Sequence, residues 1–261
     1  MLLAIDVGNT NIHFGMYSRE RGEWRSTWRA QTVHHRMSDE YAVLLRNFFQ
    51  EDGLTFADVE AVVMASVVPP LTPTFIEMSA RYLGKTLLNV THEVHSGVRV
   101  LLDHPQEIGA DRLVNAAAVQ ALYGGPAIVI DFGTATTFDV IDGDGGYLGG
   151  AITTGIGLAH DALVSRAAKL VKVDLAPPPS AIGRNTVHAM QSGLFLGYVA
   201  MIEGITARLK AELNEPQVRV IATGGLAPLF AEHTPVIEEI APNLTLDGLR
   251  IIWEMNWPKQ G

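Results

Sequence analysis

Apolar and polar residues follow a pattern along this chain that occurs twice. An apolar run over residues 127–130 ends abruptly at Asp131, which begins the sequence Asp-Phe-Gly-Thr. Residues 2–5 form a similar run that ends at Asp6, and Val-Gly-Asn-Thr follows it. Each pattern predicts a buried strand that carries a carboxylate into a glycine-containing turn.

The segments after the two turns also match. Each turn is followed by a second apolar stretch and then by a polar turn, over residues 18–22 in one case and 142–146 in the other. A third strand is predicted to start near Trp24 or Tyr147. We therefore expect two copies of one unit that begins with a β-hairpin.

Further helices and strands are predicted after each set of three strands. In the first half they are a helix from Ser38 to Gly53, a helix from Thr72 to Gly84, and strands over residues 61–68, 87–90 and 98–102. In the second half they are helices over residues 157–170, 186–213 and from Asp247, and strands over 218–222 and 236–240. Glycines at 193, 197 and 204 are expected to break or bend the long helix.

Alternation of strands and helices indicates an α/β fold. An alanine-rich helix over residues 111–123 links the two halves, and we predict the domain boundary within it. The predicted domains are residues 1–114 and 115–261. Each is small, as expected for a duplicated unit in a chain of this length.

Composition and charge exclude several classes of protein. The chain of 261 residues is 48% hydrophobic and 18% charged, so it can bury a core. A net charge of −9, without any run of basic residues, argues against a nucleic-acid partner, so local donors must meet an anionic substrate. The absence of cysteine excludes disulfides, thiolate metal sites and a cysteine nucleophile. No basic leader or long apolar run is present, so we expect a cytoplasmic protein without a membrane partner.

The two Asp-x-Gly turns have two possible interpretations. Asp, Gly and Thr are ordinary turn residues, so either copy alone could be structural. Two copies in matched surroundings favour phosphate binding, because such turns offer accessible backbone N–H groups, hydroxyl donors and a carboxylate for a hydrated cation. Two turns that face each other would form a nucleotide cleft.

The sequence Gly-Ala-Asp-Arg at residues 109–112 is the other chemical candidate. It opens a predicted helix, where Asp111 could be a cap and Arg112 a solvated side chain. A carboxylate and a guanidinium at a helix N-terminus also suit an alcohol that must lose a proton and a substrate that needs donors. Beside an ATP site, this arrangement would indicate a small-molecule kinase.

The chain resembles the type III pantothenate kinases, of the acetate and sugar kinase, Hsc70 and actin superfamily. The resemblance covers essentially the whole chain and rests on the order and spacing of six motifs: Asp-Val-Gly-Asn-Thr-Asn at 6–11, Gly-Ala-Asp-Arg at 109–112, Asp-Phe-Gly-Thr-Ala-Thr-Thr at 131–137, Gly-Gly-Ala-Ile at 149–152, Gly-Arg-Asn-Thr at 183–186 and Thr-Gly-Gly at 223–225. It implies two tandem ribonuclease H-like (actin-like ATPase) domains with an ATP cleft between them. The implied activity is ATP-dependent phosphorylation of pantothenate to 4'-phosphopantothenate, the first step of coenzyme A biosynthesis.

The resemblance also implies roles for individual residues. It places the first ATP loop on Asp6, Val7, Gly8, Asn9, Thr10, Asn11, Ile12 and His13, and a second ATP contact on Thr134. It places the substrate site on Leu102, Gly109, Ala110, Asp111, Arg112 and Thr186. Asp111 is the implied proton acceptor, Asp131 the ligand of a monovalent cation, K⁺ or NH₄⁺, and Asp6 a ligand of Mg²⁺ through water.

The implied assembly is a homodimer in which Thr186 of one subunit completes the pantothenate site of the other. Three positions depart from the family, which often has Tyr, Asn and Pro where this chain has Leu102, His104 and Thr154. The first two precede the substrate loop, so they concern the shape of the pocket more than the reaction.

Two other functions stay open at this point. One is another kinase or a phosphate-chain hydrolase of the same superfamily, which shares the Asp-x-Gly turns but is not expected to combine Gly-Ala-Asp-Arg with Thr186. The other is a non-catalytic accessory or regulatory protein that binds nucleotide without turnover. An assay of ATP consumption with and without pantothenate separates them.

Overall fold

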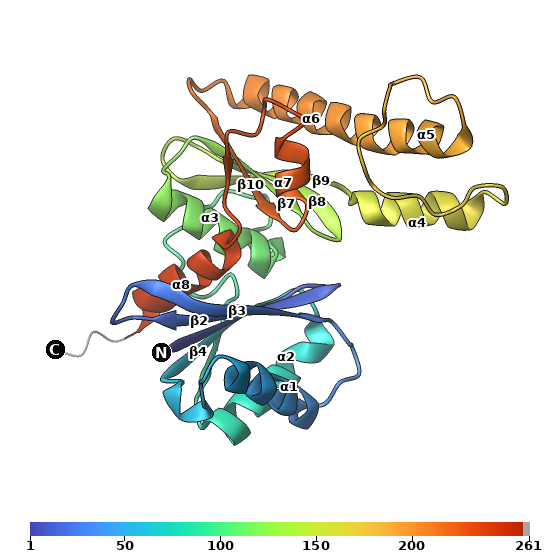
Figure 1. Cartoon of the computed structure of the whole chain (residues 1–261). Helices are drawn as coiled ribbons and strands as arrows, with labels where there is room; N and C mark the ends of the chain where they lie inside the picture. Colours follow the sequence, from blue (N-terminus) through green and yellow to red (C-terminus); the bar gives the residue numbers. More distant parts are fainter. Residues whose placement is uncertain (258–261) are drawn as a thin grey trace. The chain divides into compact units, whose positions relative to one another are not determined.

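The computed structural model of the protein describes residues 1–257, which form two compact units (Figure 1). The first unit contains residues 1–123 and the chain from Asn243 onward, and the second contains residues 124–242. This division differs from the predicted one after residue 114. Helix α3 (Ala110–Leu122) stays whole in the first unit, and the C-terminal helix α8 (Leu244–Asn256) joins it there.

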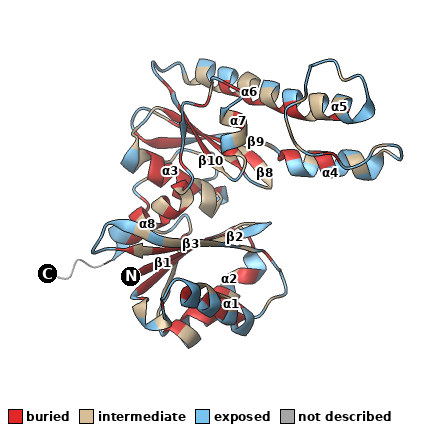
Figure 2. Ribbon diagram, viewed as in Figure 1, coloured by how far each residue is buried: buried red, intermediate tan, exposed pale blue. Residues whose placement is uncertain are grey.

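The first unit is built on a sheet whose strand order is β3-β2-β1-β4-β5. Its strands are β1 (Leu2–Val7), β2 (Asn11–Ser18), β3 (Glu23–Gln31), β4 (Ala61–Ser66) and β5 (Leu87–Asn89). Strand β1 is antiparallel to β2 and parallel to β4. The central strands are buried (Figure 2), which explains why β1 and β4 have nearly continuous apolar sequences.

Helices α1 (Ser38–Glu51) and α2 (Thr72–Met78) contribute to a core with one face of this sheet. Leu3, Ile5 and Val7 of β1 belong to this core, and so do Phe49 and Phe75 of the two helices. Because side chains alternate along a strand, Leu2, Ala4 and Asp6 lie on the opposite face. The remaining short elements of the unit are η1 (Phe56–Asp58), η2 (Pro69–Leu71), the π-helical segment η3 (Ser79–Leu83), β6 (Arg99–Val100) and η4 (Pro105–Glu107).

Helix α8 (Leu244–Asn256) joins the first unit because two glycines allow it to pack closely against α3 and β2. A Cβ at Gly248 would lie 2.1 Å from the carbonyl oxygen of Val114 in α3 (Ala110–Leu122), and a Cβ at Gly15 would lie 2.8 Å from Leu246. Trp24 Nε1 also donates to Asp247 Oδ1 at 2.8 Å, and burial raises the pKa of this carboxyl group. Pattern-based prediction located α8 to within three residues but could not show its partner.

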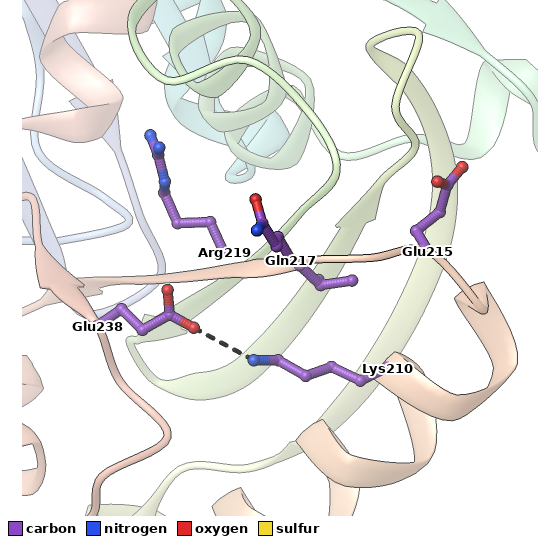
Figure 3. Close-up of a pocket in the computed structure, with 6 residues that line it drawn as sticks. Lys210, Glu215, Gln217, Arg219 and Glu238 are labelled. Carbon is purple, nitrogen blue, oxygen red and sulfur yellow. Dashed lines mark hydrogen bonds and ion pairs between the residues drawn. The ribbon is translucent and has the colours of Figure 1, made fainter.

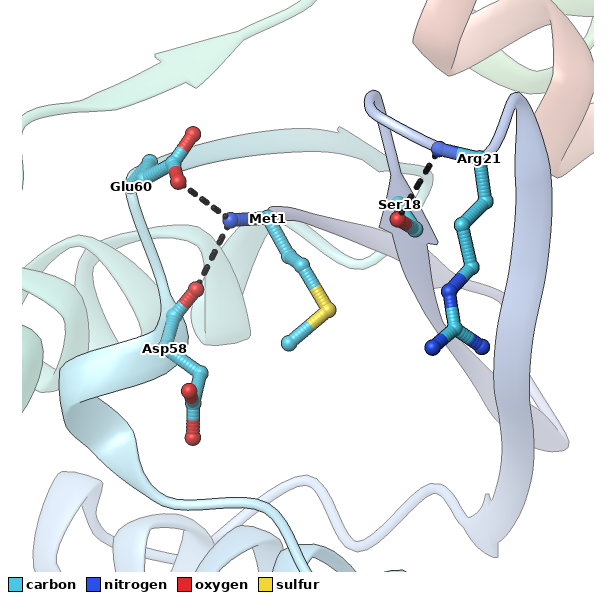
Figure 4. Close-up of polar contacts among 5 residues, drawn as sticks. All are labelled: Met1, Ser18, Arg21, Asp58 and Glu60. Atoms are coloured by element: carbon cyan, nitrogen blue, oxygen red, sulfur yellow. Dashed lines mark hydrogen bonds and ion pairs between the residues drawn. The ribbon is translucent and has the colours of Figure 1, made fainter.

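The start of β1 is fixed by polar contacts (Figure 4). The amino group of Met1 lies 3.0 Å from the Glu60 carboxylate and donates to the carbonyl of Asp58 at 2.8 Å. Strands β1 and β4 then run in parallel register, from the pair Leu2 and Ala61 to the pair Asp6 and Ala65. This register brings Asp6 to the carboxyl end of the sheet.

The second unit repeats the arrangement of the first. Its strands are β7 (Ala127–Phe132), β8 (Ala135–Ile141), β9 (Gly146–Thr154), β10 (Arg219–Gly224) and β11 (Glu239–Ile240). They follow the order β11-β10-β7-β8-β9, with β7 antiparallel to β8 and parallel to β10. The corresponding strands of the first unit have the same order and directions, so the predicted duplication of a hairpin-led unit is confirmed.

The helices of the second unit follow the prediction in part. They are α4 (Ile156–Arg166), α5 (Thr186–Gln191), the π-helical segment η5 (Ser192–Leu196), α6 (Gly197–Leu213) and α7 (Ala227–Ala231). The predicted helix over 186–213 has its expected ends, and its glycine-rich middle forms η5 without a break in the chain direction (Figure 1). The helix predicted to reach residue 170 ends at Arg166, and α7 was not predicted because five residues give no helical period. Within residues 1–257, no helix is long and apolar enough to cross a membrane.

Candidate functional site

The first candidate loop, Gly8–Thr10, connects β1 and β2, and hydrogen bonds from Thr32 hold it in place. The N–H of Gly8 donates to the carbonyl of Asn11 at 3.0 Å. Thr32 Oγ1 donates to the carbonyl of Gly8 at 2.6 Å, and the N–H of Thr32 donates to the carbonyl of Thr10 at 2.9 Å. Two loop carbonyls are therefore turned toward β3, while Asn9, Thr10 and Asn11 are exposed. Sequence reasoning missed Thr32, which follows β3 and carries no local signal of this contact.

Asp6 and His13 lie side by side at the base of this loop. They are direct cross-strand neighbours in the β1–β2 pair, and both are half-buried. Burial, helped by the positive charge of Arg29 on β3, lowers the pKa of His13 to about 4. At neutral pH the imidazole is therefore uncharged, and it can contact a ligand only as a neutral hydrogen-bonding group.

The second candidate loop, Gly133–Thr134, connects β7 and β8 and is enclosed by two other glycines. The N–H of Gly155 donates to the carbonyl of Thr134 at 3.1 Å, and a Cβ at Gly155 would lie only 2.4 Å from that oxygen. Gly224 has φ of +89°, and a Cβ there would lie 2.8 Å from Asp131 Oδ1. The Thr-Gly-Gly motif thus has a structural reason, since only glycine allows β10 to end this close to the Asp131 carboxylate.

The surroundings of Asp131 suit a small cation. Its cross-strand neighbours are Thr137 on β8 and Thr223 on β10, both with hydroxyl side chains. The carbonyl oxygens of Phe132 and Thr134 lie in the same turn. Oxygen is the ligand type that alkali and alkaline-earth cations prefer, so the donor set fits the predicted role of Asp131.

The substrate candidates Gly109, Ala110, Asp111 and Arg112 form the start of α3. Gly109 is the N-cap and gives no side-chain cap, whereas Asp111 lies in the first turn. Asp111 Oδ1 accepts the N–H of Arg112 at 2.8 Å, and a Cβ at Gly109 would lie 2.6 Å from this oxygen. Asp111 therefore satisfies one amide from within the first turn, while the N-cap position predicted as an alternative for Asp111 belongs to Gly109. Asp111 is half-buried. Leu102 is also half-buried, and His104 is exposed.

Thr186 is the first residue of α5 and is exposed. Asn185 caps this helix by accepting the N–H of His188 at 2.9 Å. A Cβ at Gly183 would lie 2.2 Å from the N–H nitrogen of Ala189, so the Gly-Arg-Asn-Thr motif folds tightly onto the helix start. A groove of about 690 Å³ adjoins it, lined by Thr186 together with Leu163, Leu170, Gly183, Arg184, Asn185, Ala189, Met190, Gly193 and Leu194.

A second hollow, of about 530 Å³, contains none of the predicted site residues. It lies beside the start of β10 and is lined by Lys210, Glu215, Gln217, Val218, Arg219 and Glu238 (Figure 3). Lys210 and Glu238 form an ion pair within it at 3.2 Å. This hollow is at the opposite end of β10 from Gly224, so we assign it no part in the chemistry.

The candidates are divided between the two units. The first loop and the start of α3 belong to the first unit, and Asp131, Thr134 and Thr186 belong to the second. Among residues 1–257 no three His, Asp or Glu side chains group closely enough to hold a metal ion. A divalent cation at Asp6 would therefore take most of its ligands from water and from the phosphates of a nucleotide.

Comparison with known families identifies the chain. The family model described as type III pantothenate kinase matches residues 2–208. The chain belongs to this family. A type III pantothenate kinase from Roseiflexus sp. is 50% identical over 256 residues, which is 98% of this chain and 99% of the relative.

Two solved structures share the fold of this family member. A conserved putative Baf family transcriptional activator from Campylobacter jejuni has a TM-score of 0.62 at 18% identity, and the match covers 97% of this chain and 98% of that one. A putative 2-dehydro-3-deoxygalactonokinase protein from Sinorhizobium meliloti has a TM-score of 0.59 at 14% identity, over 100% and 98% of the two chains. The predicted α/β fold of two ribonuclease H-like domains is therefore confirmed.

Proposed function

We propose that this chain transfers a phosphoryl group from ATP to pantothenate and forms 4'-phosphopantothenate, the first step of coenzyme A biosynthesis. The observation that carries the proposal is identity near 50% with type III pantothenate kinases over almost the whole chain. The site motifs lie within the matched part, residues 2–208, except for Thr-Gly-Gly at 223–225. Because ATP is kept inside the cell, the proposal includes the cytoplasmic location expected from the sequence.

In the proposed mechanism, Asp111 accepts the proton of the primary alcohol of pantothenate. Asp111 Oδ1 accepts the N–H of Arg112 at 2.8 Å, and the carboxylate of Asp111 is the group that we assign to the alcohol. A hydrogen bond to Oδ1 also fixes the carboxylate plane, which keeps the base oriented for attack in line with the transferring group. Arg112 adds a guanidinium to hold the substrate. Gly109 and Ala110 lie at the same end of α3, and Leu102 lies in the segment that precedes it in the chain.

The two Asp-x-Gly loops position the nucleotide. In the first loop, Asn9 and Thr10 are exposed beside the half-buried Asp6 and His13, and in the second loop Thr134 lies in the turn after β7. Asp6 would hold Mg²⁺ through water, and the ion would supply positive charge against the phosphates. Asp131 would hold a monovalent cation, K⁺ or NH₄⁺, beside the second loop. No covalent intermediate on the protein is required.

The proposed assembly is a homodimer in which Thr186 reaches the partner's pantothenate site. An apolar surface on the second unit supports this assembly. Six large apolar side chains of α4, α5, η5 and their connecting segment are exposed, by 38% to 79%: Leu158, Leu163, Val171, Ile182, Val187 and Leu196. Exposed apolar side chains that gather beside a groove are typical of an interaction site. Leu163 lines the same groove as Thr186, and Thr186 directly precedes Val187 in the chain.

Two experiments test this proposal. The first measures ADP release with ATP and a panel of alcohols, and release that depends on pantothenate is expected. Equal release with sugars would favour another kinase, and nucleotide binding without release would favour an accessory protein.

The second experiment mixes two variants, Thr186→Ala and Asp111→Asn. Each is expected to be weakly active alone, and mixed dimers should regain activity because one of their two sites is intact. If subunit exchange is demonstrated and activity does not return, the shared site is wrong.

A further inference from the structure

A third side chain lies in line with Asp6 and His13 on the sheet of the first unit. Strand register pairs Asp6 with His13, and it pairs His13 with Arg29 of β3. Directly paired residues of adjacent strands point to the same face of a sheet. Ile5, Ile12 and Trp28, each next to one of the three in sequence, pack in or against the core with α1 and α2. Asp6, His13 and Arg29 therefore form a row on the opposite face.

This row lies at a fixed offset from the first loop. Adjacent strands are about 4.8 Å apart, so only the width of β2 separates Arg29 from Asp6. Three residues after Arg29, Thr32 donates to the carbonyls of Gly8 and Thr10. Helix α8 covers the same face at Gly15 and Trp24, nearer the other end of these strands. The row is thus at the loop end of the face.

Among the three side chains of the row, Arg29 is the one that supplies a positive charge. Asp6 is an acid, and the guanidinium of Arg29 is the group in the row whose positive charge does not depend on pH. Arg29 is exposed, and within residues 1–257 its guanidinium has no ion pair or hydrogen bond. The neighbouring arginines are engaged, since Arg21 pairs with Glu23 at 4.0 Å and Arg25 donates to the carbonyl of Asp52 at 3.2 Å. In a protein of net charge −9, a triphosphate requires a local cation of this kind.

We propose that Arg29 binds the phosphates of ATP as the cationic partner of the first loop. A guanidinium presents paired N–H donors that match two phosphate oxygens, and its charge does not depend on pH in the working range. The inference rests on the proposed function, since it takes the loop over residues 6–13 as the site of the phosphates. Arg29 lies outside that loop and outside each of the six sequence motifs.

Binding of ATP and of AMP to Arg29→Gln and Arg29→Lys tests this role, with calorimetry as the readout. Loss of a charge-assisted hydrogen-bond pair should weaken ATP binding by about 10- to 100-fold. AMP, which lacks the terminal phosphates, should change by less than about threefold. The lysine variant keeps the charge but loses the fork, and it should fall between wild type and Arg29→Gln.

Arg25→Gln is the matched control, because it removes a guanidinium from the same strand at a place where the structure gives it another partner. It should leave ATP binding unchanged. All variants should melt within a few degrees of wild type, since Arg29 is exposed and its side chain has no hydrogen bond or ion pair among the described residues 1–257.

Asn9→Ala separates failure of this inference from failure of the loop itself. If Asn9→Ala weakens ATP binding and Arg29→Gln does not, the loop stands and the role of Arg29 is wrong. If neither variant changes ATP binding, the assignment of the first loop is wrong and the inference falls with it. If Arg29→Gln raises only the KM for pantothenate, Arg29 serves the substrate and the inference is overturned.

Discussion

The two Asp-x-Gly loops follow the same strand pattern, but different parts of the structure hold them in place. Three residues, Gly8–Thr10, link β1 to β2, and two, Gly133–Thr134, link β7 to β8. A side chain, Thr32, supports the first loop, which leaves exposed residues around the turn. The backbone of Gly155 packs closely against the second loop, and the backbone of Gly224 packs closely against the Asp131 carboxylate.

Under the proposed function, this difference would allow the two copies of one motif to bind different ligands. An exposed loop with polar side chains can receive a large, flexible ligand such as a phosphate chain. A carboxylate held against glycine backbone, among hydroxyl and carbonyl oxygens, suits a small cation that gives up part of its water. In the proposed function the first loop would be the main phosphate contact, and the second loop would mainly hold a cation, with Thr134 as its one ATP contact.

The largest effect on the rate of phosphoryl transfer is expected at Asp111, which lies outside both loops. In the proposed mechanism the loops only position the phosphates, whereas Asp111 accepts the proton. Asp111→Asn keeps size and can still accept the N–H of Arg112, but it cannot take a proton. General-base assistance contributes about 10²–10⁴-fold, so single-turnover phosphoryl transfer should slow by at least about 100-fold. Melting temperature and ATP binding should stay close to wild type. A variant that transfers phosphate within a few-fold of the normal rate would leave Asp111 with only its structural contact.

The next effect concerns the glycines around the second loop. Gly224→Ala adds a Cβ at positive φ within 2.8 Å of Asp131 Oδ1, and strain of this kind costs about 2–4 kcal/mol of unfolding free energy. Gly8→Ala should cost less, because its Cβ would meet one oxygen, of Asn11, at 3.0 Å. Gly157→Ala is the control, since nothing lies within 4 Å of a Cβ there. Denaturant unfolding of the three variants measures the difference, and equal losses at Gly224 and Gly8 would contradict the contrast between the loops.

Removal of the Asp131 charge should produce a smaller but more specific change. Asp131→Asn keeps the size and hydrogen-bonding capacity of the side chain, and loss of one charged ligand should lower turnover by about tenfold or more. Turnover should also lose its dependence on K⁺ or NH₄⁺. Glu212→Gln removes a carboxylate from an exposed position on α6 and serves as the control. Activation by K⁺ to the wild-type extent in Asp131→Asn would place the cation elsewhere.

The smallest effect is a pH dependence from His13, which lies on β2 beside the first loop. His13 has a pKa of about 4 in the folded chain, below its ordinary value of 6.5. Between these values the unfolded chain binds a proton that the folded chain does not, so stability should fall as pH drops from about 6.5 to about 4. His13 is half-buried, and solvent screening reduces the expected loss to about 1–2 kcal/mol. The slope of unfolding free energy against pH should be shallower in His13→Gln, and an unchanged slope would show that His13 titrates normally.

Sequence reasoning worked best where structure depends on neighbours along the chain. The strand–turn–strand units at Asp6 and Asp131 and the ends of the long helix at Thr186 and Leu213 agree with the structure to within a residue or two. Apolar periodicity, glycine turns and caps act over a few residues, so they can be interpreted locally. The same approach failed for α7 and for the end of α4, where the pattern is too short or the next residues stay apolar.

The sequence by itself determined the repeated hairpin unit, the polar turn in each copy and, through its motifs, the family to which the chain belongs. Tertiary structure decided which unit α8 joins, because that depends on the contact of Gly248 with Val114 in α3. It also decided that Thr32 supports the first loop, that Gly224 closes on Asp131, and that Arg29 shares a row with Asp6. These choices depend on strand register and on backbone approach between residues far apart in the chain. A local pattern specifies neither, because many partners offer the same apolar surface and only the packed fold selects one of them.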